Sequence, residues 1–319
     1  MSERPPEAVL WDFLRGAMMT RALGIAADLN IAERLAERPQ SVQELAGEVG
    51  VDGAALNRLL RALASDGVFA EHEPGAFCNT KVSQQLLAEG WPDFARLFGD
   101  LFYRATGDLN RAVQTGRATF ADSFGSDFWS WLAAHPDERA AFDRAMAGGK
   151  DRTADRLAEL GWRDDEVVVD VGGGNGTLLM ELVRRRPKLH GIVFDLPETE
   201  RDESKLGDRI EFVEGSFFEH VPAGDAYVLS GILHDWDDER AAAILRVIRS
   251  AAAQHARLLL TESVVPPGNE PHGAKWLDLL MLVLAAGRER TEEDWRALLE
   301  SAGFRAERID DGLIEARCL

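Results

Sequence analysis

A glycine-rich turn and the acid before it are the residues with the clearest chemical potential in the sequence. The run 166–176, Glu-Val-Val-Val-Asp-Val-Gly-Gly-Gly-Asn-Gly, predicts a buried strand that ends in a sharp turn into a helix. Gly172, Gly174 and Gly176 fit a backbone with positive φ, or a ligand lying against the main chain. Asp170 stands at the strand end, where a carboxylate would repel phosphate but would suit an ammonium or sulfonium group. The pattern favours a nucleotide-like ligand that carries a positive charge.

A second acid follows the next predicted strand. Residues 191–197, Gly-Ile-Val-Phe-Asp-Leu-Pro, place Asp195 about where an acid accepts hydrogen bonds from ribose hydroxyls. The glycine turn alone is a weak indication of function. The turn and Asp195 together favour a ligand that contains a nucleoside.

His234 is the third candidate, in the segment 233–239, Leu-His-Asp-Trp-Asp-Asp-Glu. A lone histidine beside an aspartate is more often a helix-start or packing residue than a functional one. It follows a predicted strand, however, and doubly wound sheets bind ligands beyond the carboxyl ends of their strands. The residues alone leave both interpretations open.

Together these segments resemble the class I S-adenosylmethionine-dependent methyltransferases. The His-Asp-Trp run and the segment 287–291, Gly-Arg-Glu-Arg-Thr, narrow the resemblance to small-molecule O-methyltransferases of plant phenolics and bacterial aromatic natural products. It covers nearly the whole chain. The resemblance implies methyl transfer from S-adenosyl-L-methionine to a phenolic hydroxyl, leaving S-adenosyl-L-homocysteine. It further implies His234 as general base, Glu289 as the acid that orients it, and Glu262 as a supporting acid.

The resemblance also implies how the methyl donor is held. Its amino-acid and ribose parts would contact the glycine turn and the second acid, and its adenine would lie between Ser216 and Phe217. Many family members carry aspartate where Ser216 stands, so the hydrogen bond to adenine is expected to be weaker here. The full donor-binding set is Asp170, Gly172, Gly174, Asp195, Ser216, Phe217 and Ser230.

The acceptor is expected to be a flat, apolar molecule. Aromatic residues are frequent between residues 91 and 149, and most must pack in the core. A minority would wall a pocket in which flat rings select flat ligands. By resemblance, the acceptor-contacting residues are Phe142, Met146, Asp278 and Met281. The expected substrate is an aromatic small molecule, an intermediate of natural-product or antibiotic biosynthesis.

The N-terminal region predicts a winged helix, which opens a rival function. Ser41 and Glu44 have capping-box spacing, and a second helix over 52–66 precedes a short hairpin. The layout would suit a ligand-sensing transcription regulator. The second helix, however, offers only Arg58 and Arg61 as cations, and a net charge of −19 opposes binding to nucleic acid. In the resembled enzymes this layout serves dimerisation, so a homodimer through the N-terminal helices is expected.

The fold class expected is α/β, in two parts. From Asp151 onward helices and strands alternate as in a Rossmann-like doubly wound sheet. Its last two strands, 304–309 and 313–317, should pair as an antiparallel edge hairpin. The expected domains are a mostly helical winged-helix dimerisation domain over 1–90, a helical connector contributing to the substrate pocket over 91–150, and an S-adenosylmethionine-binding catalytic domain over 151–319.

The composition gives no reason to expect a metal, a membrane or a disulfide framework. The histidines are scattered without His-x-x-His pairs, and no apolar run reaches the length of a membrane span. Cys78 and Cys318 are the only cysteines and lie far apart. Residues 1–6 lack the pattern of a signal peptide. These features favour a reducing cytoplasm.

One alternative shares the expected fold. A bacterial branch of the resembled family binds the methyl donor but hydroxylates or decarboxylates polyketides instead of methylating them. The presence of His234 favours methylation over that outcome.

Overall fold

The computed structural model describes residues 5–197, 199, 206–310 and 312–319. It divides the chain into two compact units. One comprises Met1–Gly107 with Asp137–Gly148, and the other Asp108–Pro136 with Gly149–Leu319. The stretch 91–150 is therefore shared between them. Residues 1–4, part of the stretch examined for a signal peptide, lie outside the described residues. Within the described part, no helix combines the length and apolarity that crossing a membrane requires.

The first unit contains the predicted winged helix. Helices α3 (Val42–Val49) and α4 (Gly53–Ser65) precede the hairpin of β2 (Phe69–Glu73) and β3 (Ala76–Asn79), and β1 (Gln40–Ser41) completes an antiparallel sheet of order β1-β3-β2. The predicted capping box is present: Glu44 N–H donates to Ser41 Oγ, and Ser41 N–H donates to the Glu44 carboxylate. Asp52 caps α4 by accepting a hydrogen bond from Ala55 N at 2.7 Å. The side-chain caps explain why both helices begin where the sequence predicts.

Further helices complete this unit. They are α1 (Pro6–Asp28), α2 (Ile31–Arg34), the 3-10 helix η1 (Ser83–Leu87), α5 (Trp91–Gly99), α6 (Leu101–Ala105), η2 (Thr106–Asp108) and α10 (Pro136–Ala147). Helices α1 and α5 approach each other at two glycines: a Cβ added to Gly24 would lie only 2.6 Å from the Cα of Gly99. The contact is possible because neither residue has a side chain.

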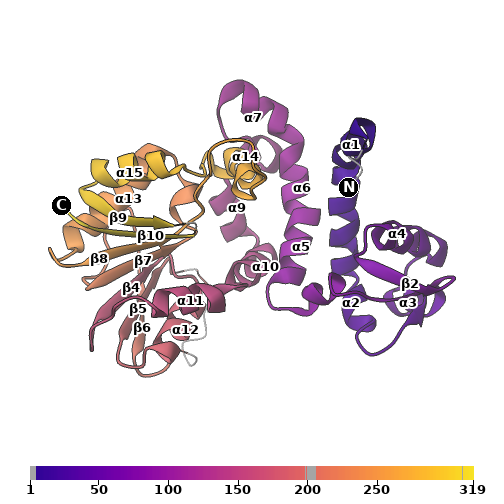
Figure 1. Cartoon of the computed structure of the whole chain (residues 1–319), viewed down its shortest axis with the longest axis horizontal. Helices are drawn as coiled ribbons and strands as arrows, with labels where there is room; N and C mark the ends of the chain where they lie inside the picture. The colour runs from indigo at the N-terminus through magenta and orange to yellow at the C-terminus, as the bar shows by residue number, and fades with distance from the viewer. Residues whose placement is uncertain (1–4, 198, 200–205, 311) are drawn as a thin grey trace. The chain divides into compact units, whose positions relative to one another are not determined.

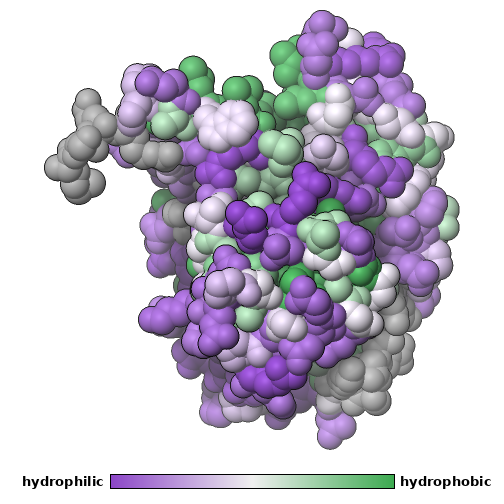
Figure 2. Space-filling model, turned by 90° about the vertical axis from the view of Figure 1, so that its right-hand side faces the viewer, coloured by the Kyte–Doolittle hydropathy of each residue, from purple (hydrophilic) through white to green (hydrophobic). Residues whose placement is uncertain are grey.

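The N-terminal half of α1 carries large apolar side chains that this unit does not cover. Their residues are 58–73% exposed: Leu10, Trp11, Phe13, Leu14 and Met18. On the face drawn in Figure 2, hydrophobic residues reach the surface between polar ones, most of all along its upper edge. Large exposed apolar faces commonly mark protein–protein contacts.

The second unit is built on a seven-stranded sheet of order β6-β5-β4-β7-β8-β10-β9 (Figure 1). The strands are β4 (Val167–Val171), β5 (His190–Asp195), β6 (Ile210–Glu214), β7 (Ala226–Ser230), β8 (Arg257–Thr261), β9 (Phe304–Asp310) and β10 (Leu313–Cys318). The first five are parallel, whereas β10 runs antiparallel to both β8 and β9. The predicted doubly wound sheet with an antiparallel edge hairpin is confirmed.

Helices cover both faces of this sheet. Helices α11 (Lys150–Ala158) and α12 (Thr177–Arg185) pack on one face, and α13 (Asp238–Ala251) and α15 (Glu292–Ser301) on the other. Alternate strand residues divide between the two cores: Val168 and Val228 join the α11 side, whereas Val169 and Leu229 join the α13 side. Because side chains alternate along a strand, the same parity places polar residues at the strand ends on one face or the other.

An aromatic cluster lies among the remaining helices of the second unit. They are α7 (Leu109–Thr115), α8 (Phe120–Phe124), α9 (Phe128–Ala134) and α14 (Ala274–Ala285), with η4 (Leu233–Asp235) preceding α13. Phe120 stacks on Phe124 with ring centroids 4.2 Å apart and meets Trp131 edge-on. Thr119 N–H donates to Val283 O, which ties this cluster to α14. These aromatic residues pack against one another, as most of those in the stretch were expected to do.

Candidate active site

His234 lies just beyond the carboxyl end of β7, in the short helix η4. The chain leaves the strand through Gly231, whose φ of 66° lies in the left-handed region that favours glycine. The Nδ1 atom of His234 lies 2.7 Å from Oε1 of Glu289, and Nε2 lies 3.6 Å from Oδ1 of Asp235. The His234 side chain is 19% exposed, so the imidazole is held on one edge and accessible on the other.

Glu289 is fixed by its own neighbours. Its side chain is fully buried, and its backbone N–H donates to Asp278 Oδ1 at 2.8 Å. Gly287, two residues earlier, lies directly against the histidine segment: a Cβ there would come within 2.1 Å of His234 O. The neighbouring Arg288 N–H donates to that same carbonyl at 2.8 Å. The loop that carries Glu289 is thus locked onto the backbone of His234.

Arg290 and Glu262 hold the same segment from two further sides. The completely buried guanidinium of Arg290 donates to Leu233 O and Trp236 O at 2.8 and 2.9 Å and pairs with Asp238. Glu262, directly after β8, accepts hydrogen bonds through Oε1 from Ile232 N and Leu233 N at 2.9 and 2.8 Å. Its Oε2 lies 4.0 Å from His234 Nδ1. Glu262 therefore anchors the backbone and adds a second negative charge near the imidazole.

The surrounding acids control the charge of this cluster. Burial alone would lower the pKa of His234, but Asp235, Glu262 and Glu289 outweigh it and raise the pKa to about 10. Burial raises the pKa of Asp235 to about 7 despite the opposing effect of His234. The acids around His234 thus favour the protonated form of its imidazole.

The glycine turn forms on the neighbouring strands as predicted. Gly172, Gly174 and Gly176 have φ values of 71°, 58° and 82°, a region that L-residues with side chains rarely adopt. Gly172 N–H donates to Phe194 O at 2.8 Å, which joins the turn to the end of β5. A Cβ on Gly174 would meet no atom within 4 Å, so open space adjoins the backbone at that point.

The acids at the ends of β4 and β5, Asp170 and Asp195, differ in environment. Asp195 accepts hydrogen bonds from Gly174 N through Oδ2 at 2.7 Å and from Thr199 Oγ1 through Oδ1 at 2.8 Å. Asp170 is only 2% exposed, and its Oδ2 has no hydrogen-bond partner. Burial raises the pKa of Asp170 to about 7, although Lys150 acts to lower it. An unpaired buried carboxylate costs free energy, so it calls for a positively charged or hydrogen-bonding partner.

Ser216 and Phe217 follow β6 at the same edge. Ser216 Oγ accepts a hydrogen bond from Phe218 N at 3.3 Å, and the ring of Phe217 lies 3.7 Å from the position of a Cβ on Gly172. Ser230 ends β7 and accepts a hydrogen bond from Lys150, described below. The second unit thus brings together the donor-binding residues predicted in the sequence with His234, Glu262 and Glu289.

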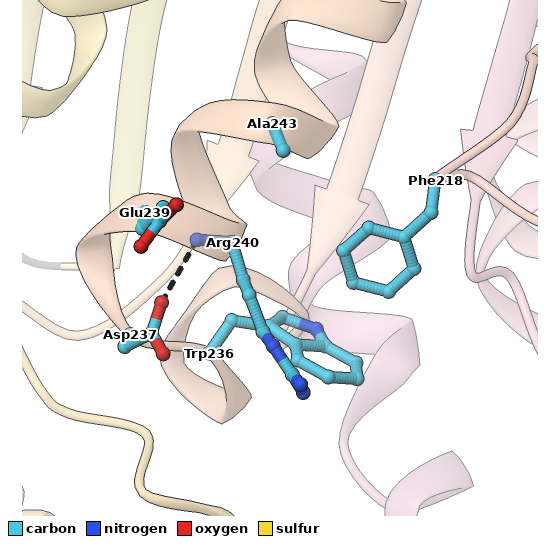
Figure 3. Close-up of a pocket in the computed structure, with 6 residues that line it drawn as sticks. All are labelled: Phe218, Trp236, Asp237, Glu239, Arg240 and Ala243. Carbon is cyan, nitrogen blue, oxygen red and sulfur yellow. Dashed lines mark hydrogen bonds between the residues drawn. The ribbon is translucent and has the colours of Figure 1, made fainter.

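A cavity of about 560 Å³ lies beside this edge, lined by Phe218, Trp236, Asp237, Glu239, Arg240 and Ala243. Figure 3 shows Arg240 reaching over the indole of Trp236, and the ring of Phe218 beside that indole. The centroids of the two rings are 4.9 Å apart in an edge-on arrangement. None of the predicted site residues lines this cavity, although Trp236 belongs to the segment of His234 that Arg290 holds.

The predicted acceptor residues have different environments. Asp278 and Met281 lie on α14, where Asp278 supports the backbone of Glu289 and Met281 is only 6% exposed. Phe142 and Met146 lie on α10 in the other unit, with Met146 37% exposed. Trp295 is completely buried and donates to Ser263 O.

Sequence reasoning did not single out three residues that the structure places in the site. Gly287 and Arg290 lie near Glu289 in the segment 287–291, which the sequence analysis used for the family resemblance. Their position in that segment was the one sequence feature that could have indicated them. Lys150 had no signal, because its partner lies 80 residues away. Among the residues that the structure describes, no group of three or more His, Cys, Asp or Glu side chains is arranged to hold a metal ion.

Comparison with known proteins agrees with this geometry. Residues 106–305 match the model of the O-methyltransferase domain, and residues 11–89 match the O-methyltransferase dimerisation domain. Phenazine O-methyltransferase PhzM of Lysobacter antibioticus is 40% identical over 317 residues, covering 96% of this chain and 93% of that protein.

Solved structures are similar over the full length. The crystal structure of LaPhzM superposes with a TM-score of 0.92 at 37% identity, covering 99% of this chain and 100% of that one. The O-methyltransferase NcsB1 of neocarzinostatin biosynthesis, solved with S-adenosyl-L-homocysteine and 1,4-dihydroxy-2-naphthoic acid, gives a TM-score of 0.82 at 29% identity with complete coverage of both chains.

Proposed function

The chain belongs to the O-methyltransferase family, and from this premise we propose that it methylates a phenolic hydroxyl of an aromatic small molecule with His234 as general base. It is an S-adenosylmethionine-dependent enzyme. The observation that carries the proposal is the imidazole of His234, held by Glu289 at 2.7 Å beside the glycine turn of the same sheet.

The residues of the turn fit the methyl donor. Open space adjoins the backbone at Gly174, and Asp170 presents a buried oxygen without a partner, which suits an ammonium group. Asp195 is held in place by the turn, and its remaining lone pairs can accept hydrogen bonds from ribose hydroxyls. The adenine is proposed to lie against Ser216 and Phe217, and the amino-acid end against Gly172 and Ser230. When bound, the donor supplies a methyl group activated by its positively charged sulfur.

His234 would remove the phenolic proton as the oxygen attacks. Glu289 occupies Nδ1, which fixes the tautomer and leaves Nε2 as the atom that can accept a proton. An ordinary imidazole with a pKa near 6.5 takes a proton from a phenol of pKa ~10 at a cost of roughly 5 kcal/mol. The acids around His234 raise its pKa, and each unit by which it approaches the pKa of the phenol removes about 1.4 kcal/mol of this cost. Asp235 and Glu262 raise this pKa through their charges, and Glu289 adds to it through its hydrogen bond and its charge. Glu289 is proposed as the acid that orients the imidazole, with Glu262 in support.

The raised pKa has a cost of its own. A group of pKa about 10 must first lose its proton, which at pH 7 costs about 4 kcal/mol. A positive charge brought close to the imidazole disfavours the imidazolium form and lowers this cost. His234 is therefore proposed to become an effective base only in the donor-bound enzyme.

The acceptor is proposed to be a flat phenol from a natural-product pathway, contacted by Phe142, Met146 and Met281. Such acceptors occur among the relatives: NcsB1 was solved with 1,4-dihydroxy-2-naphthoic acid. Asp278 is proposed to act on this reaction by positioning, because its carboxylate holds the backbone of Glu289. An O-acceptor is proposed because the matching family model and the similar proteins are O-methyltransferases, and the reaction is proposed to need no metal.

The homodimer is proposed to form through the first unit. Residues 11–89 match a dimerisation domain, and α1 carries the exposed apolar side chains that such a contact would bury. A cytoplasmic location remains a proposal, supported by the two cysteines, both free.

The test uses methyl-labelled S-adenosylmethionine with a panel of phenols, including 1,4-dihydroxy-2-naphthoic acid, and follows label in the product by mass spectrometry. We expect label on a phenolic oxygen with the wild-type protein. His234→Ala should retain donor binding and lose turnover. Hydroxylated or decarboxylated products without label would instead assign the chain to the non-methylating alternative.

A further inference from the structure

Two opposite charges lie on the same face of the sheet near its carboxyl edge. Asp170 lies two residues after Val168 in β4, and Ser230 lies two residues after Val228 in β7, so each points to the same face of the sheet as that valine. Both valines belong to the core on the α11 side. Lys150 is the first residue of α11 and reaches that face from above the strands. Helix α11 therefore brings a cation to the strand ends that carry Asp170 and Ser230.

Lys150 is half-buried, yet no carboxylate of the described residues lies within ion-pair distance of its ammonium group. Its Nζ donates to Ser230 Oγ at 2.8 Å and lies 3.5 Å from Ser230 O. Burial lowers the pKa of Lys150, and the more distant charges of Asp170 and Glu262 only partly oppose this. The close partners of this partly desolvated ammonium group are the oxygens of one neutral serine. The group therefore has hydrogen-bond donors and a positive charge left to bind an anion.

Asp170 is the matching group of opposite sign. Its Oδ2 is buried without a partner, and Gly173 packs against the carboxyl group so closely that a Cβ there would lie 2.8 Å from Oδ2. Glycine at position 173 leaves that space to the carboxyl group, because a side chain there would clash with it. Lys150 does not neutralise it by direct contact, since their interaction is only electrostatic at longer range.

The amino-acid end of the methyl donor carries one carboxylate and one ammonium group. We propose that Lys150, together with Ser230, binds the carboxylate of the donor, opposite Asp170, which accepts its ammonium group. This inference rests on the proposed function. It makes Lys150 a specificity-determining residue, because a donor analogue without the carboxylate would leave the ammonium group of Lys150 unpaired. Sites built to make a polar contact reject ligand analogues that lack the group making that contact.

The test compares three ligands by calorimetry on the full-length protein. They are S-adenosylhomocysteine, its decarboxylated analogue, which keeps the amine, and 5′-methylthioadenosine, which lacks the amino-acid end. The variants are Lys150→Met, similar in length without the charge, and Lys188→Met, an exposed lysine paired with Asp164 as matched control.

We expect the wild type and Lys188→Met to prefer S-adenosylhomocysteine over its decarboxylated analogue by about tenfold to a hundredfold. In Lys150→Met this preference should nearly vanish, with the affinity for 5′-methylthioadenosine unchanged. In turnover, the KM for the donor should rise far more than kcat falls.

Two results would overturn the inference while leaving the proposed function intact: an unchanged preference in Lys150→Met, or an equal loss of affinity for all three ligands, as a merely structural role would give. Failure of the wild type to bind S-adenosylhomocysteine at all would instead reject the proposed function, and the inference with it.

Discussion

Replacing Glu289 by glutamine should make His234 a weaker base without disturbing its position. The side-chain carbonyl of Gln can still accept the Nδ1 hydrogen across the 2.7 Å contact, but the negative charge is gone. A hydrogen bond to a charged group contributes about 1.5–3 kcal/mol, which corresponds to a pKa lower by about 1–2 units. The pKa of His234 should therefore fall from about 10 to about 8 or 9.

Two assays measure this change. NMR titration of ¹⁵N-labelled imidazoles, with the His234 signals assigned by their loss in His234→Asn, gives the pKa directly. In kcat/KM against pH, the acidic limb should move to lower pH by about 1–2 units, and the plateau should fall about three- to tenfold because a weaker base accepts the proton less readily. Glu300→Gln, an exposed carboxylate on α15, is the matched control and should change neither quantity.

The raised pKa of His234 also determines how the free energy of unfolding changes with pH. The folded pKa of His234 is raised, so its contribution is fully present below pH about 6.5 and is lost as pH rises through about 10. The free energy of unfolding should therefore fall less steeply between pH 7 and 10 in Glu289→Gln than in the wild type. An imidazole pKa that stays near 10 in Glu289→Gln would refute the reasoning, because the Glu289 charge would then contribute nothing to it.

Three further predictions address other parts of the protein. Asp170→Asn should raise the free energy of unfolding by about 1–3 kcal/mol at pH 8 but little below about pH 4, where Asp170 is largely protonated both in the folded protein, with its pKa of about 7, and in the unfolded chain, with a pKa of ~3.9. The same substitution should weaken donor binding. Equal stability of the variant and the wild type at pH 8 in chemical denaturation would contradict the prediction. Arg290→Met should lower stability by about 2–4 kcal/mol, because it leaves the backbone carbonyls of Leu233 and Trp236 without their donor, whereas the exposed Asp238 keeps its hydrogen bond from Arg288; a change below about 1 kcal/mol in the same denaturation experiment would show that these hydrogen bonds contribute little. Leu14→Glu should shift the protein from dimer to monomer in light scattering, with unchanged circular dichroism; a persistent dimer would place the interface elsewhere.

Local sequence signals predicted much of the fold. The capping box at Ser41 and Glu44 depends on residues three positions apart, and the glycine turn after β4 depends on consecutive residues, so both can be read from a short window. The edge hairpin followed from the closeness of its two strands in sequence. The candidate site followed from one rule, that ligands bind beyond the carboxyl ends of parallel strands.

The contacts between distant segments could not be predicted in this way. Gly287 is required because the chain passes within van der Waals distance of His234 O, a meeting of segments that are over fifty residues apart. In the sequence Arg290 has no feature that sets it apart from other charged residues. In the structure it is completely buried and donates a hydrogen bond to the carbonyl of Leu233, next to His234. Lys150 meets Ser230 only because α11 packs across the strands. Such contacts depend on the packing of elements that sequence periodicity places only approximately.

The central claim is that His234 is the base for methyl transfer. Single-turnover transfer of labelled methyl to a phenolic acceptor by His234→Asn, in protein shown by calorimetry to bind S-adenosylhomocysteine normally, tests it most directly. We expect the rate to fall by about a hundredfold or more, the usual contribution of a positioned base. Transfer at a rate close to the wild type, with donor binding intact, would contradict the assignment of His234 and of the acids that hold it.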